Sequence, residues 1–96
     1  MYGLIGRMLA APGKREELLA VMLNGNTLMP GCRSYVIARD PASEDGIWIT
    51  EVWDSKEQHA ASLDIPAVRE MIGHARPLIA GFAERIETEP LGGTGV

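Results

Sequence analysis

Four residues near the middle of the chain have the types and spacing to form a ligand site where a strand meets a helix. Ile49, Glu51 and Trp53 alternate along a predicted strand, so their side chains share one face of the sheet. An indole offers a flat stacking surface and one N–H donor, which suits an aromatic ligand. A carboxylate on a core-facing position is costly unless it is paired or lies beside a wet cavity. His59 lies one turn into the following helix, and an imidazole is chemically able to transfer a proton.

Each candidate also has a purely structural explanation. Trp53 could close the core at the corner between strand and helix, and Glu51 could pair with an arginine at the sheet edge. His59 and His74 could both lie on exposed helix surfaces. Tyr35, on an earlier predicted strand, could give a hydroxyl to a cavity or only pack. Residue types alone leave both explanations open.

Several common classes of site and partner are not supported by the sequence. It has no phosphate-binding glycine loop and no G-x-S-x-G motif, and His59, His74 and Cys32 lack metal-ligand spacing, so we expect no metal. The net charge of -4, with scattered basic residues, argues against nucleic acid and anionic membranes as partners. A lone cysteine, no signal-peptide pattern and no long apolar run predict a cytoplasmic protein that does not enter the membrane.

The elements that must position these residues follow the order β-α-β-β-α-β. Strands are predicted over 2–10, 32–40, 47–53 and 82–89, and helices over 14–28, 56–63 and 67–79, with Pro66 breaking the second helix. Ser55 and Gln58 form a capping box at the start of that helix. Gly6 in the first strand suggests a bulge or the close approach of a ligand. This order predicts an α+β, ferredoxin-like fold: a four-stranded antiparallel sheet with the helices on one face.

The organisation of the chain predicts one domain and a second copy. Residues 1–90 form the expected domain, and residues 91–96 a flexible tail. The third strand is apolar on both faces, with Trp48 and Val52 opposite the set that contains Trp53. A sheet with one solvated face would instead alternate apolar and polar residues. We therefore expect a homodimer that packs sheet against sheet through Trp48 and Val52.

Nearly the whole chain, residues 3–88, resembles antibiotic biosynthesis monooxygenase (ABM) domains. The string "TEVWDSKEQHAASLDIPAV" resembles a family segment that reads roughly E-x-W-x-S-x-E-x-H-x-x-H-x-x-x-P-H. "GRMLAAPGKREELLAVM" resembles the first strand and helix of the family, and "PGCRSYVIARDPASEDGIWITEVW" its PGC-x-x-Y strand and hairpin. The resemblance implies a dimeric α/β barrel with a cavity between sheet and helices in each subunit.

The resemblance also implies a reaction. Some members oxidise aromatic phenols, anthrones or quinols with molecular oxygen and without metal or flavin, so no cofactor is expected. Trp53 would wall the substrate, and His59, His74, Tyr35 or Arg7 could handle protons or the anion. Together with Tyr35 and Arg7, Glu51 and Ile49 would line the substrate site.

Three positions depart from the family pattern and leave two alternatives. Ser62 and Ala67 stand where the family segment has histidines, and Gly6 stands where haem-degrading members have an asparagine. One alternative is a non-catalytic dimeric module that holds a small apolar molecule. The other is a haem-binding or haem-degrading protein, with His74 as a conceivable axial ligand.

Overall fold

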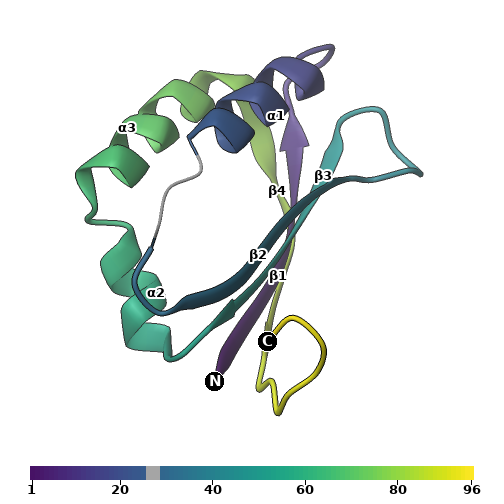
Figure 1. The fold of residues 1–96 in the computed structure, drawn as a ribbon. Helices are drawn as coiled ribbons and strands as arrows, with labels where there is room; N and C mark the ends of the chain where they lie inside the picture. The colour runs from purple at the N-terminus through teal and green to yellow at the C-terminus, as the bar shows by residue number, and fades with distance from the viewer. Residues whose placement is uncertain (26–28) are drawn as a thin grey trace.

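A four-stranded antiparallel sheet with its helices on one face forms the protein (Figure 1). The computed structural model describes residues 1–25 and 29–96. The elements run in the order β1 (Tyr2–Ala10), α1 (Arg15–Asn24), β2 (Cys32–Arg39), β3 (Gly46–Trp53), α2 (Lys56–Ser62), α3 (Pro66–Ala75), the 3-10 turn η1 (Arg76–Leu78) and β4 (Ile79–Thr88). The strand order is β2-β3-β1-β4. The predicted ferredoxin-like fold is confirmed.

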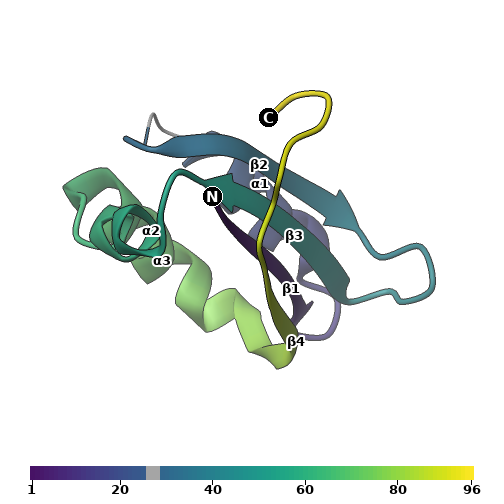
Figure 2. The same ribbon diagram turned by 90° about the horizontal axis from the view of Figure 1, so that it is seen from below.

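The break in the second helical region follows from its sequence. Ser55 has an extended backbone, and its hydroxyl accepts a hydrogen bond from the backbone N–H of Gln58 at 3.2 Å, which begins α2. Pro66 is the first residue of α3, a position where its missing N–H costs nothing. Figure 2 shows α2 and α3 as successive segments along one side of the sheet. The predicted break near Pro66 is therefore confirmed.

Two predicted boundaries at the end of the chain are wrong. Helix α3 ends at Ala75 instead of continuing to residue 79, and β4 begins at Ile79 rather than at residue 82. Pro77 supplies the reason, because proline lacks the N–H that an α-helix would need there. The chain makes a single 3-10 turn and then enters the sheet, so Gly81 lies inside β4 instead of preceding it.

The predicted end of the first helix is also too late. Helix α1 ends at Asn24 and Gly25 follows it, whereas the prediction extended to residue 28. A Cβ at Gly25 would lie 2.3 Å from Cγ of Met71, so α3 packs closely over this glycine. Residues 26–28 of the predicted helix lie outside the described residues.

The main core lies between the helices and the sheet. Leu18, Leu19 and Met22 of α1 pack with Ile47 and Ile49 of β3. Tyr2, Leu4 and Trp53 form a second cluster near the start of α2. Along β3 the core-facing residues alternate with others that are partly or fully exposed, as expected for side chains on opposite faces of a strand.

No described helix covers the second face of the sheet. Val36, Thr50, Ile5 and Ile86 are aligned across β2, β3, β1 and β4 on this face. Val36 is 53% exposed and Ile86 51%. Trp48 lies on the same face, with the guanidinium of Arg7 5.8 Å from its ring. The sheet of a single chain is open, so the predicted barrel would require a second copy.

Candidate functional site

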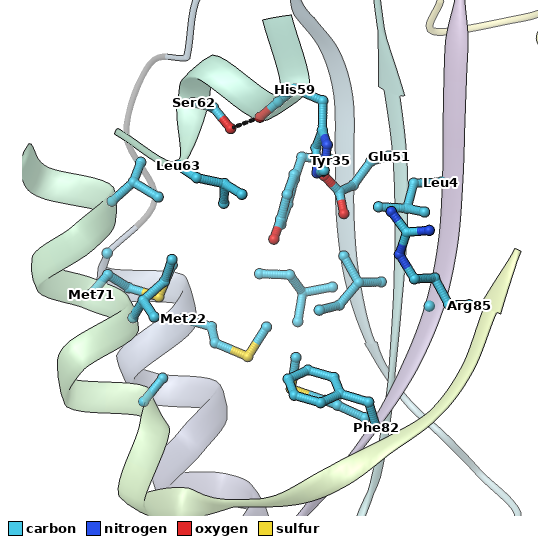
Figure 3. A pocket seen from close by; sticks show the side chains of 18 of the residues that line it. Leu4, Met22, Tyr35, Glu51, His59, Ser62, Leu63, Met71, Phe82 and Arg85 are labelled. Carbon is cyan, nitrogen blue, oxygen red and sulfur yellow. Dashed lines mark hydrogen bonds and ion pairs between the residues drawn. The ribbon is translucent and has the colours of Figure 1, made fainter. Parts of the chain in front are cut away.

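A cavity of about 360 Å³ lies between the sheet and the helices, in the place where the fold brings strand and helix side chains together (Figure 3). Four of the five methionines of the chain line it, which gives walls that are apolar and adaptable: Met8, Met22, Met29 and Met71. Among the described helices, none is long and apolar enough to span a membrane. The cavity is the candidate site.

Two rows of the sheet form the cavity floor. Tyr35 of β2 is opposite Glu51 of β3, and the next core-facing position on β3, Ile49, is opposite Gly6 of β1. A Cβ at Gly6 would meet only the backbone oxygen of Glu84, at 3.7 Å, so there is room above this glycine. The sequence suggested that a ligand could come close to Gly6, and this space above the glycine is where it would do so.

Glu51 and Trp53 form a buried pair on β3. The indole Nε1–H of Trp53 donates to Oε1 of Glu51 at 3.0 Å. Trp53 is 1% exposed and Glu51 9%. Because so little of the Trp53 ring is exposed, this residue contributes more by holding Glu51 than by offering a broad stacking wall. Figure 3 shows the Glu51 carboxylate directed into the cavity.

Burial dominates the electrostatics of Glu51. It raises the pKa of this carboxyl above its ordinary value, because a buried charge loses its hydration. The hydrogen bond from Trp53, and the charges of His59 and Arg85, oppose the rise without cancelling it. Arg85 comes from β4, directly opposite Gly6. The predicted last strand, residues 82–89, included this arginine, but the sequence does not show which residues of that strand lie opposite Gly6 and Glu51, so Arg85 was not named as a site residue.

His59 and Tyr35 border the same end of the cavity. The His59 Nε2 lies 3.7 Å from Oε1 of Glu51, too far for a hydrogen bond. Its ring packs against Tyr2 and edge-on to Trp53, with centroid distances of 5.6 and 5.3 Å. Burial raises the pKa of Tyr35 well above its usual value, and the nearby Glu51 adds to the rise. The Tyr35 hydroxyl therefore stays neutral, and Figure 3 shows it pointing into the cavity.

The structure does not bring every predicted site residue into this group. His74 is absent from the cavity lining; its side chain is 69% exposed and its Nε2 lies 3.9 Å from Glu70. Arg7 borders the cavity, but its guanidinium bonds to Glu84 and lies over Trp48 on the other face of the sheet. Ile49, Glu51, Trp53, His59 and Tyr35 do meet at the cavity.

Two further features bear on the alternatives. Ser62, which stands at a histidine position of the resembled segment, is buried, and its hydroxyl donates to the backbone oxygen of His59 at 2.6 Å. Ser62 borders the cavity, but its hydroxyl proton is used in a hydrogen bond within α2. Within residues 1–25 and 29–96, no three His, Cys, Asp or Glu side chains converge to hold a metal ion.

Comparison with known proteins identifies a family. The family model described as "Antibiotic biosynthesis monooxygenase" matches residues 1–74. A solved structure named "putative Antibiotic biosynthesis monooxygenase", from Chloroflexus aurantiacus J-10-fl, is 56% identical and has a TM-score of 0.91, with 96% of this chain and 94% of that chain covered. No curated protein matches the chain.

More distant structures share the fold. A structure named "Putative antibiotic biosynthesis monooxygenase", from Nitrosomonas europaea, is 14% identical, with a TM-score of 0.83 and coverage of 96% of this chain and 100% of that one. Another, from Caulobacter crescentus CB15, is 18% identical, with a TM-score of 0.84 and coverage of 95% and 90%. At these identities the likeness concerns the arrangement of the sheet and helices.

Proposed function

The chain belongs to the antibiotic biosynthesis monooxygenase family, and we propose that it is a cofactor-independent monooxygenase that oxidises a small aromatic phenol, anthrone or quinol with molecular oxygen. The observation that carries this proposal is the cavity of about 360 Å³, apolar on most sides, with Glu51 and Tyr35 directed into one end. Family membership supports a monooxygenase in general. The substrate class and the oxygen chemistry are our proposal.

The size and lining of the cavity support an aromatic substrate. An apolar cavity of roughly 150 Å³ holds benzene, so this volume suits two or three fused rings. Methionine and aliphatic side chains would contact the ring faces, and the polar end would receive a hydroxyl or carbonyl oxygen. A phenol or quinol has this division between an apolar body and a polar edge.

The proposed reaction balances without an added reductant. An electron-rich aromatic anion supplies four electrons to O₂; one oxygen atom enters the ring as a carbonyl, and the other leaves as water. The protein would hold the anion away from water, orient it, and accept the proton that ionisation releases. Tyr35, whose raised pKa keeps it protonated, can donate a hydrogen bond to the developing oxyanion.

Oxygen consumption with a panel of naphthols, quinols and anthrones tests this function. Labelling with ¹⁸O₂ should place one labelled atom in the product, since an oxidase that forms only peroxide would place none. The variant that should block the reaction is Gly6→Val, which fills part of the cavity floor at a position where the strand has room. Equal rates for the native protein and this variant with every compound would contradict the proposal, because the turnover would then be spontaneous.

A homodimer is the second part of the proposal, with Trp48 and Val52 at its centre. Its support is the uncovered sheet face, where Val36 and Ile86 are each more than half exposed. Val36→Glu should give a monomer in sedimentation at micromolar concentration, because it places a charge between the packed sheets. Leu23→Glu, on α1 and 59% exposed, is the matched control and should leave the dimer intact. A monomeric native protein would contradict this part.

One observation favours a second candidate, a non-catalytic module that binds a small apolar molecule. Position 62, where the family segment has a second histidine, is a serine whose hydroxyl donates to the backbone oxygen of His59. The helix α2 therefore offers one histidine to the cavity, which leaves fewer groups for catalysis. Tight binding of a naphthol with no oxygen consumption by any compound would support this candidate. Haem binding is the least favoured alternative because His74 lies outside the cavity lining, and a haem titration followed at the Soret band tests it.

A further inference from the structure

We infer that Glu51 is the proton acceptor of the cavity, and that its Oε2 receives the hydroxyl proton of a phenolic ligand. The inference rests on the proposed function and deepens it, because it assigns the proton to one atom and restricts the ligand to compounds with an O–H at their polar end. The two oxygens of Glu51 have different surroundings, and this difference carries the argument.

One oxygen of Glu51 is occupied by the protein. Oε1 accepts the Nε1–H of Trp53 at 3.0 Å, and the Nε2 of His59 lies 3.7 Å from the same oxygen. In the described part of the chain, Oε2 accepts no hydrogen bond. The residue as a whole is 9% exposed. Among the described residues, the one fully buried side-chain nitrogen or oxygen without a partner is Nε of Arg15, so Oε2 of Glu51 keeps some exposed surface, and a donor that enters the cavity could reach it.

The other polar groups at this end of the cavity are poor proton acceptors. Arg85 is a cation, and Tyr35 is a neutral hydroxyl whose pKa burial raises. The Nε2 of His59 is turned toward Oε1 of Glu51, while the His59 ring is packed between Tyr2 and Trp53. Among the described residues that line the cavity, the other carboxylate is Glu84, and it already binds Arg7.

The surroundings of Glu51 suit a base that must act on a phenol. Five residues from four elements face Glu51: Trp53 of the same strand, His59 of α2, Tyr35 and Cys32 of β2, and Arg85 of β4. The net effect of burial and these neighbours is to raise the pKa of Glu51, which reduces the difference between this pKa and that of a phenol, about 10. A carboxylate with a modestly raised pKa is sufficient for general-base catalysis.

The proton transfer adds no charge to the cavity. The O–H bond of the ligand breaks, the proton goes to Oε2 of Glu51, and the electron pair stays on the ligand oxygen. The site already holds one negative charge, and the step moves that charge from the carboxylate to the ligand. The desolvation cost of a buried anion is thus already present before the ligand binds, and Trp53 keeps its bond to Oε1 throughout.

Binding without oxygen tests the acceptor directly. Under nitrogen, the native protein should bind 2-naphthol at least about tenfold more tightly than 2-methoxynaphthalene, since a hydrogen bond to a charged group is worth that much. Glu51→Gln should lose most of this preference. Glu87→Gln is the matched control: Glu87 lies in the same row of the sheet, two strands away, but not in the cavity lining, so the preference should stay.

The pH dependence of the native protein supplies a test that needs no variant. The preference for naphthol over its methyl ether should shrink on acidification as Glu51 takes up a proton. If a reaction is found, kcat/KM should rise with pH through the same titration. Glu51→Gln should lower it by about a hundredfold or more and remove this titration.

The results separate this inference from the proposed function. A naphthol preference that is pH-independent, or unchanged in Glu51→Gln, overturns the inference whether or not oxygen is consumed. A preference that depends on Glu51, without oxygen consumption by any compound, supports the acceptor and removes the monooxygenase. Oxygen consumption that Glu51→Gln leaves intact supports the monooxygenase and removes the role of Glu51 as its base.

Discussion

Replacing Gly6 by valine should stabilise the protein and narrow the cavity, whereas a larger side chain usually destabilises a packed core. A Cβ at this position meets only the backbone oxygen of Glu84 at 3.7 Å, and Gly6 has no positive φ angle. Alanine at a strand glycine gains about 0.5–1 kcal/mol from lower chain entropy. Two more methyl groups would add up to about 0.8 kcal/mol each if fully buried. Because the cavity is partly open, we expect a total of about 1–2 kcal/mol.

Thermal unfolding and ligand binding together check this reasoning. One kcal/mol corresponds to roughly 4–8 °C in Tm for a domain of this size, so the shift is measurable. Gly6→Val should bind 2-naphthol at least about tenfold more weakly, and Gly6→Ala should fall between it and the native protein.

Gly81→Val is the matched control. Gly81 is also a strand glycine with nothing within 4 Å of its Cβ, but it pairs with Leu9, outside the cavity lining. This control should bind normally. If Gly6→Val lowers the Tm, or binds naphthol as well as Gly81→Val does, the space above Gly6 is not the ligand site.

Three other predictions concern the buried pair of Glu51 and Trp53 and the start of α2. Trp53→Phe should lower the free energy of unfolding in urea by about 1.5–3 kcal/mol and raise the pKa of Glu51 further, because it removes the bond to Oε1; unchanged stability would contradict this. Because the pKa of Glu51 is raised, the folded protein keeps the Glu51 proton to a higher pH than the unfolded chain does. The free energy of unfolding of the native protein, compared with that of Glu51→Gln, should therefore fall as the pH rises from the ordinary carboxyl range through the folded-state pKa. A constant difference between these two proteins would refute that sign. Ser55→Ala should cost about 1 kcal/mol by urea titration, since it removes the N-cap of α2, and a loss below about 0.3 kcal/mol would mean the cap is redundant.

The sequence predicted the fold well because its signals are local. Alternating apolar residues identify β3, and Ser55 with Pro66 marks the start and the break of the second helical region. The same alternation placed Ile49, Glu51 and Trp53 on one face, and burial confirms that face. The start of β4 was missed because the chain leaves α3 through a single 3-10 turn, a transition with no periodicity of its own.

The cavity itself could not be predicted from local patterns. Its polar end combines Tyr35 and Glu51, which neighbouring strands bring opposite each other, with His59 from a helix. Strand register decides which residues meet, and a shift of one residue would turn Tyr35 to the other face. His74 shows the converse: its residue type suits chemistry, but the last turn of α3 directs it to solvent.

The way Glu51 is held argues that the carboxylate serves a ligand rather than the fold. A buried acid that only stabilised the structure would be expected to have both oxygens satisfied, or to pair with a cation at hydrogen-bond distance. Here Trp53 satisfies one oxygen, and the nearest histidine nitrogen stays at 3.7 Å. Apolar residues at positions 51 and 53 would pack in this core without that penalty. Burial raises the pKa of Glu51, and the same property makes the group a stronger base for a phenol in the cavity.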